Sequence, residues 1–249
     1  MEDSKEIDTP IATTTKLDID ELGSYVDQKL YRGMIGTLLY LTSSRLDIVF
    51  SVGLCARFPT NPKESHLTTV KRILRYLKST IDFCLWYPKG SNFNLVGYAD
   101  ADYASFLMDR KSTSGLEHFL GSCLVFWATK KQNSVALSTA EAEYVDAASC
   151  CTQLLWIKQQ LMDFGINVGC ILIFCDNTSA ISMTKNQVHH KRTKNIDVRH
   201  HFLRDNYEKG LITMEFCATN KQIYNIFTKA LSRYYFERNW FEFGMIKIT

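Results

Sequence analysis

The stretch Asn94-Leu95-Val96-Gly97-Tyr98-Ala99-Asp100 decides the fold, because it is a mainly apolar run that ends in a single carboxylate. A second run, Ile171-Leu172-Ile173-Phe174-Cys175, ends in the same way at Asp176. Short apolar runs of this kind predict buried strands. Glu143 lies early in a third stretch, residues 138–165, that is predicted to be a helix. Acids placed in this way are expected to converge at one end of a sheet.

Carboxylates crowded at one place repel one another, so a site that contains three of them implies divalent cations. Mg²⁺ with oxygen ligands is the most common solution. The expected chemistry is metal-assisted hydrolysis of a phosphodiester. Each acid also has a structural explanation: Asp100 and Asp176 as turn residues, and Glu143 as a residue on an exposed helix face.

The elements around these acids predict an α/β domain. Residues 116–120 and 123–128 flank Gly121-Ser122 and read as a hairpin, so the first three strands are expected to be antiparallel. Ser138-Thr139-Ala140-Glu141 matches a capping box, which explains Glu141 and opens a helix that Gly165 ends. The remaining elements, in chain order, are a strand to Asp176, a helix at 178–186, a helix ending near Gly210, a strand at 211–217 and a helix at 221–231. Together they predict a mixed five-stranded sheet with helices on both faces.

A smaller helical segment is expected to precede this domain. Residues 1–24 show no periodicity and read as an irregular leader. Residues 27–58 are expected to be helical, with an apolar stripe formed by Leu30, Met34, Leu38 and Leu41. After Pro59 and Pro62, a further helix carries an apolar face (Val70, Ile73, Leu74, Leu77) and a basic face (Lys71, Arg75, Lys78) that is either merely solvated or in contact with phosphates. The expected divisions are 1–24, 25–88, 89–235 and 236–249.

Composition narrows the class of protein. With 249 residues, 46% of them hydrophobic, the chain can build a sizeable core. No stretch reads as a transmembrane segment, and the polar start Met1–Glu6 gives no sign of a secretory signal, so we expect an intracellular location without membrane contact. Eight cysteines are scattered without a C-x-x-C pair, which favours buried thiols and no zinc site. The four tryptophans are expected in the core.

Positive charge is concentrated between His189 and Gly210. This segment contains six Lys or Arg residues and three acidic residues, so its formal charge of +3 equals the net charge of the whole chain. Cations beside a carboxylate site are suited to holding a polyanionic duplex, and Lys191, Arg192 and Lys194 are the residues most suited to contact phosphates. The histidines at 189, 190, 200 and 201 lack the spacing of a structural zinc site.

Several motifs, taken in their order along the chain, resemble those of ribonuclease H. Their sequences are still more similar to the Pol polyprotein of copia-type LTR retrotransposons. The motifs are Gly97-Tyr98-Ala99-Asp100-Ala101-Asp102, Asp109-Arg110-Lys111-Ser112-Thr113-Ser114-Gly115, Ser138-Thr139-Ala140-Glu141-Ala142-Glu143-Tyr144, Cys175-Asp176-Asn177, His190-Lys191-Arg192-Thr193-Lys194, Ile196-Asp197-Val198-Arg199 and Thr228-Lys229. Residues 31–41 and 71–78 resemble the segment that joins reverse transcriptase to its ribonuclease H domain in that family. No Tyr-x-Asp-Asp occurs, so no polymerase activity is expected.

The resemblance implies a ribonuclease H-like fold and a site with four carboxylates that hold two Mg²⁺ ions, with Mn²⁺ as an alternative. Carried over by motif, Asp100, Glu143 and Asp176 are the first three catalytic and metal-binding residues. The fourth position is Asn225, which has the shape of aspartate without its charge; Tyr224 before it and Asn195 also depart from the family pattern. These departures predict weakened metal binding.

The implied function is cleavage of the RNA strand of RNA·DNA hybrids, with the reverse transcriptase of the same element as a partner and the cytoplasm or nucleus as the location. Asn225 keeps a second reading open, in which the chain is an inactive retroelement remnant that binds nucleic acid or has no selected function. A third reading, a protein-interaction module, would require an exposed apolar patch and no metal.

Overall fold

The computed structural model describes residues 4–90, 92–106, 108–185, 194–218 and 223–248, and of residues 194–200, 223 and 224 it describes the backbone alone. The chain divides into two compact units. Unit 1 comprises Met1–Tyr87 and Lys229–Thr249, and unit 2 comprises Pro88–Thr228. The sequence analysis assigned residues 229–235 to the second domain, whereas they belong to unit 1.

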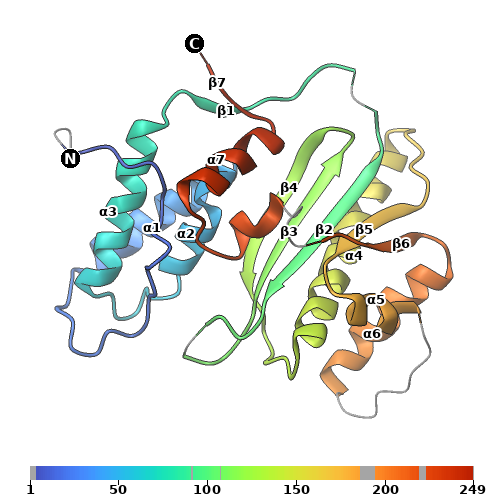
Figure 1. Ribbon diagram of the computed structural model, residues 1–249, viewed down its shortest axis with the longest axis horizontal. Coiled ribbons are helices and arrows are strands. Elements are labelled where there is room, and N and C mark those ends of the chain that lie inside the picture. Colours follow the sequence, from blue (N-terminus) through green and yellow to red (C-terminus); the bar gives the residue numbers. More distant parts are fainter. Residues whose placement is uncertain (1–3, 91, 107, 186–193, 219–222, 249) are drawn as a thin grey trace. The chain divides into compact units, whose positions relative to one another are not determined.

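Unit 2 is built on a five-stranded mixed sheet (Figure 1). Its strands are β2 (Leu95–Asp102), β3 (Thr113–Leu120), β4 (Cys123–Lys131), β5 (Ile171–Cys175) and β6 (Ile212–Phe216). They lie side by side in the order β4-β3-β2-β5-β6. β2 pairs antiparallel with β3, and β3 with β4, whereas β5 runs parallel to both β2 and β6. This arrangement confirms the mixed five-stranded sheet expected from the sequence.

Helices α4 (Thr139–Asp163), α5 (Thr178–Lys185) and α6 (Lys194–Glu208) pack against this sheet and against one another (Figure 1). The Ser138 side chain caps α4 by accepting a hydrogen bond from Glu141 N at 3.2 Å, as the capping box predicts. A short 3-10 helix, η3 (Ile223–Phe227), contacts β2 and β3. The helix expected at 221–231 is therefore shorter than predicted, and among its described residues it is a 3-10 turn.

Side-chain alternation places η3 on the face of the sheet opposite α4. A Cβ on Gly97 would lie 2.5 Å from Leu154 Cδ1 and 2.7 Å from Cys150 Sγ, so α4 packs directly over this glycine. A Cβ on Gly115 would instead lie 2.7 Å from Thr228 Cγ2 and 3.2 Å from the Phe227 Cβ. Gly97 pairs with His118, three residues from Gly115, and an odd offset along a strand points to the opposite face. Two glycines thus allow close packing on both faces.

Unit 1 is mainly helical. It contains α1 (Gln28–Leu41), the 3-10 turn η1 (Leu46–Ile48), α2 (Val49–Cys55), α3 (Glu64–Ser79) and α7 (Arg233–Glu242). A two-stranded antiparallel sheet joins β1 (Phe83–Leu85) to β7 (Met245–Lys247). The described part of the irregular leader, residues 4–24, contains no helix. It is nevertheless tied to α3: Arg72 Nε donates to Thr9 O at 3.1 Å, and the ring nitrogen His66 Nε2 lies 2.8 Å from Asp18 O.

Two expectations about the core are wrong. In α1 the buried residues are Tyr31, Ile35 and Leu38, whereas Leu30, which began the predicted stripe, is 59% exposed. The helix was predicted correctly, but its apolar face is rotated because Tyr31 fills the interior and donates its hydroxyl proton to Cys55 O at 2.9 Å. Trp86 and Trp156 are also exposed, and of the four tryptophans only Trp240 is fully buried.

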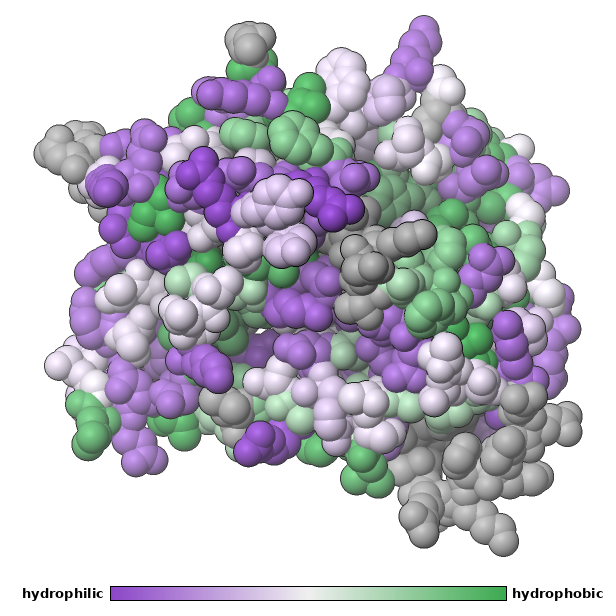
Figure 2. All heavy atoms as spheres, in the orientation of Figure 1, coloured by the Kyte–Doolittle hydropathy of each residue, from purple (hydrophilic) through white to green (hydrophobic). Residues whose placement is uncertain are grey.

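The surface is of mixed polarity. Figure 2 shows apolar side chains interspersed with polar ones over the visible face, and many large apolar side chains are exposed. Among the described residues, no helix is long and apolar enough to cross a lipid bilayer. None of the eight cysteines, all of which the structure describes, forms a disulfide, and four of them, Cys55, Cys150, Cys151 and Cys175, are buried.

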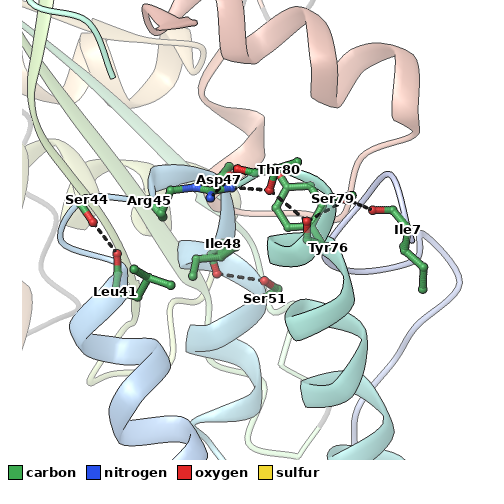
Figure 3. Close-up of polar contacts among 10 residues, drawn as sticks. All are labelled: Ile7, Leu41, Ser44, Arg45, Asp47, Ile48, Ser51, Tyr76, Ser79 and Thr80. Atoms are coloured by element: carbon green, nitrogen blue, oxygen red, sulfur yellow. Dashed lines mark hydrogen bonds and ion pairs between the residues drawn. The ribbon is translucent and has the colours of Figure 1, made fainter. Parts of the chain in front are cut away.

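A buried ionic network holds the end of α3 to the turn that follows α1 (Figure 3). Arg45 lies 2.6 Å from Asp47 Oδ2 and donates to Thr80 O at 3.0 Å, while the Tyr76 hydroxyl donates to the same Asp47 carboxylate. The Asp47 side chain is fully buried. Desolvation raises the pKa of Tyr76, and the neighbouring Asp47 raises it further, so the phenol remains a proton donor. Three charged or polar groups therefore depend on one another.

We predict that Asp47→Asn destabilises the protein by about 3–5 kcal/mol, because it leaves the Arg45 guanidinium buried without its counter-ion. Urea-induced unfolding measures the loss. The matched control is Glu64→Gln, which breaks the half-exposed Lys71–Glu64 pair and should cost less than about 1 kcal/mol. Equal losses in the two variants would contradict a special role for the buried network.

Candidate active site

The parallel pairing of β2 with β5 brings the ends of these two strands to the same edge of the sheet. Ala99 lies opposite Cys175, so Asp100 and Asp176, the next residue on each strand, follow this matched pair. Glu143 comes from the second turn of α4, which packs over β2. The three acids predicted from the sequence therefore come from three elements that meet at one edge.

Glu143 is the most firmly held of the three. Its Oε1 accepts a hydrogen bond from the Ala101 backbone N–H at 3.1 Å, and its Oε2 lies 3.8 Å from Cys175 Sγ, which donates to it. The side chains of Glu143, Cys175 and Asp176 each offer one ligand atom, and these atoms lie within 4.8 Å of one another. We call these three residues the metal-binding group. Glu143 and Cys175 are buried, while Asp176 is half-buried.

Asp100 lies beside this group on the neighbouring strand. Its side chain is buried, and its Oδ2 accepts a hydrogen bond from the Thr228 hydroxyl at 2.5 Å. Its charge nevertheless reaches Glu143, because it is the second largest cause of the shift in the pKa of Glu143. Asp100 thus acts on the metal-binding group through charge, and its carboxylate is oriented by Thr228.

Asn225, which the resemblance assigns to the fourth position, lies in η3, and Thr228, the first residue after η3, reaches Asp100. Thr228 N donates to Asn225 O at 3.3 Å, which closes a turn, and the hydroxyl of the same threonine donates to Asp100. The absence of a side chain at Gly115 leaves the room that Phe227 and Thr228 occupy against the sheet. Asn225 therefore lies in the turn that Thr228 joins to Asp100.

Burial and the repulsion of neighbouring acids favour the protonated form of Glu143 in the absence of a cation. The pKa of Glu143 is raised to about 10, chiefly by desolvation and then by the charges of Asp100, Asp176 and Asp146. Desolvation likewise raises the pKa values of Asp146 and Glu117 well above the usual carboxylate range. The pKa of the Cys175 thiol is raised for the same reason. Negative charge in this region therefore requires compensation.

Other predicted residues have different outcomes. Glu141 Oε2 accepts a hydrogen bond from Leu137 N at 2.8 Å at the exposed start of α4, in keeping with a capping role. Lys191 and Arg192 lie outside the residues that the structure describes, as does the side chain of Lys194.

The sequence analysis assigned no role to Cys175, Asp146 or Thr228. The first two looked like ordinary members of an apolar strand and of a helix. Thr228 was noted only within a motif. Its closeness to Asp100, 128 residues earlier in the chain, exists only in three dimensions.

Solved structures with a related fold come from nucleic-acid enzymes. A foamy viral protease-reverse transcriptase, in a dRH form in complex with double-stranded DNA, matches 81% of this chain and 34% of its own with a TM-score of 0.52 at 14% identity. A ribonuclease H1 isolated from compost matches 52% of this chain and 87% of its own with a TM-score of 0.40 at 10% identity. At these identities the likeness concerns the fold alone.

Proteins related by sequence are more similar to this chain than these solved structures are. The retrovirus-related Pol polyprotein from transposon RE2 of Arabidopsis thaliana is 35% identical over 98% of this chain, and that from transposon TNT 1-94 of Nicotiana tabacum is 36% identical over 95%. The chain spans 17% and 18% of the length of these two relatives. No family model matches it. Over nearly its whole length, the chain is therefore similar to a segment of retrovirus-related Pol polyproteins from plant transposons.

Proposed function

We propose that unit 2 is a ribonuclease that cleaves the RNA strand of RNA·DNA hybrids with Mg²⁺ or Mn²⁺, and that Asn225 weakens it. The observation that carries this proposal is the buried carboxyl of Glu143, which shares the metal-binding group with Asp176 and is repelled by Asp100. The three side chains offer oxygen ligands, which Mg²⁺ and Mn²⁺ prefer. A divalent cation would offset the desolvation and the repulsion that otherwise favour the protonated form of Glu143.

Some residues of the proposed site would hold the cations, and others orient the carboxylates that do so. Asp100, Glu143 and Asp176 would hold the cations, which when bound supply a hydroxide nucleophile and stabilise the leaving 3′ oxygen. The Ala101 N–H fixes one oxygen of Glu143 and leaves the other directed at the group. Thr228 fixes one oxygen of Asp100. Each of these two acids therefore has one oxygen held by the protein.

Asn225 is the weak point of such a site. Its amide oxygen can touch a cation but carries no negative charge, so it gives a divalent ion much less electrostatic support than aspartate would. A site with three carboxylates would bind its metals less tightly than one with four. We therefore propose slow turnover that depends strongly on metal concentration.

The proposed substrate follows from the family and from the charge of the chain. The basic residues Lys191, Arg192 and Lys194 are proposed to contact phosphates of the hybrid. Selection for the hybrid would depend on its A-like shape and on the 2′-hydroxyls of the RNA strand, with little reading of bases. In a Pol polyprotein such a domain would act with the reverse transcriptase of the same element, in the cytoplasm or nucleus.

One observation favours a second function. Because Asn225 removes the fourth carboxylate, the site can retain its fold and its affinity for nucleic acid without cleaving it. The alternative proposal is therefore an inactive remnant that binds RNA·DNA hybrids. The two proposals differ in what happens when the fourth carboxylate is restored.

We predict that the protein cleaves a labelled RNA·DNA hybrid slowly in Mg²⁺ or Mn²⁺. Asp100→Asn removes a proposed metal ligand itself. It should therefore lower the cleavage rate by at least about 100-fold, the upper end of the loss caused by removing an outer-shell partner of a metal. Asn225→Asp should raise the rate by about tenfold or more and lower the Mg²⁺ concentration needed. Silence of all three proteins, with intact fold and hybrid binding, would favour the inactive remnant.

We predict that Thr228→Val reduces cleavage by about 10- to 100-fold, because Asp100 loses the hydroxyl that orients its carboxylate. Thr228→Ser retains that hydroxyl and should restore most of the rate. The rate measured against Mg²⁺ concentration separates orientation from general damage, since a positioning role requires a higher half-saturating Mg²⁺ concentration in Thr228→Val. An unchanged half-saturating concentration would argue against the role proposed for Thr228.

We predict that the metal-free protein loses stability as the pH rises from about 5 to about 10. The pKa of Glu143 is about 10 in the folded protein against an ordinary value of 4.5, so between these values the folded state holds the extra proton. Stability is then greatest below the lower value and falls as the pH rises. Stability is measured by unfolding at several pH values in the presence of a chelator. Glu143→Gln should lose less stability with rising pH than the unmodified protein. Glu141→Gln, on the exposed first turn of α4, serves as the control. Identical slopes in the unmodified protein and Glu143→Gln would contradict the shift.

A further inference from the structure

We propose that the metal-binding group also binds a thiophilic divalent cation such as Zn²⁺ or Cd²⁺, with Cys175 Sγ as one ligand beside Glu143 and Asp176, and that this ion competes with Mg²⁺. The inference rests on the proposed function only in that the same two carboxylates serve both kinds of ion. The sequence analysis expected no zinc site because no C-x-x-C pair occurs. These ligands, however, are brought together by α4 and β5 from positions 32 residues apart.

The separation of the ligand atoms fits a shared metal. Bond lengths of about 2.3 Å to sulfur and about 2.0 Å to oxygen, at the tetrahedral angle, place the two ligands about 3.5 Å apart. Cys175 Sγ and Glu143 Oε2 are 3.8 Å apart, so a few tenths of an ångström separate the observed pair from that geometry. All three ligand atoms lie within 4.8 Å of one another, and the Asp176 side chain that completes the set is half-buried.

One contact of the sulfur suits a metal-bound thiolate. Cys175 is completely buried, and the Asn177 backbone N–H donates to its Sγ at 3.4 Å. A donor of this kind stabilises negative charge on a ligand sulfur in the way that outer-shell hydrogen bonds do at metal sites. When the ion binds, a sulfur–metal bond would replace the S–H bond of Cys175 and an oxygen–metal bond the O–H bond of Glu143, and both protons would pass to solvent.

The sulfur ligand determines which class of ion binds more tightly at this group. Mg²⁺ takes oxygen ligands in octahedral geometry and gains nothing from a thiol, whereas thiolate ligands select Zn²⁺ and similar soft ions. Three protein ligands leave a fourth position open to water, the arrangement found at zinc sites that are not purely structural. Because Glu143 and Asp176 would serve either ion, occupancy by Zn²⁺ would exclude Mg²⁺ from the same carboxylates.

The test is a titration of the chelator-treated protein with Cd²⁺, without nucleic acid or Mg²⁺, followed by the ultraviolet sulfur-to-cadmium charge-transfer band. All proteins carry Cys170→Ser, which removes the exposed thiol. Cys175→Ser should lose the tightest binding component, with an affinity loss of at least about tenfold, the lower bound known for loss of an outer-shell partner. Cys151→Ser removes an equally buried thiol of unit 2 outside the metal-binding group and should retain that component.

A second variant covers the case in which Cys175→Ser does not fold. Glu143→Gln keeps the thiol and the shape of the side chain, and it should weaken the tight component by a similar factor. A tight component that survives either Cys175→Ser or Glu143→Gln, or that Cys151→Ser removes equally, would overturn the inference. Since binding is read without turnover, a protein that binds Cd²⁺ through Cys175 but never cleaves a hybrid refutes the nuclease proposal alone.

Discussion

The close approach of α4 to β2 is the constraint on which the rest of unit 2 depends. It is possible because Gly97 has no side chain, so that Leu154 and Cys150 rest directly on the strand. At this distance the second turn of α4 reaches the end of β2, where the Ala101 N–H receives Glu143. A bulkier residue at position 97 would move the helix outward and carry Glu143 away from Asp176. The chemistry of the site therefore depends on a glycine that takes no part in it.

The same packing places an unusual amount of potential charge in the interior. Glu143, Asp146 and Glu117 are all buried, and desolvation raises the pKa of each. A protein tolerates such groups by protonating them or by neutralising them with a cation. Glu143 has the second option, because Asp176 and Cys175 complete a group of ligands around it. Fold stability and metal affinity are thus two outcomes of one electrostatic arrangement.

Much of this arrangement could be predicted from the sequence, because strand ends and helix starts have local signals. Asp100 and Asp176 each close an apolar run, and the Ser138 cap locates the helix that carries Glu143. The remainder depends on contacts between distant residues. Nothing near Thr228 indicates that its hydroxyl reaches Asp100, and the rotated face of α1 followed from Tyr31 filling the core, which periodicity alone could not show. Short 3-10 turns such as η3 also lack a periodic signal long enough to define them.

The order of the two units along the chain has a consequence for biosynthesis. Unit 2 is one continuous segment, whereas unit 1 is interrupted by it and needs residues after Thr228, including the strand β7 that pairs with β1. When Thr228 has emerged from the ribosome, all of unit 2 is available for folding, but only the larger part of unit 1. Unit 2 can therefore complete its fold first, while β1 remains without its partner strand. Until β7 emerges, the nascent chain carries an open β-edge at Phe83–Leu85, a feature that chaperones and other nascent chains can engage.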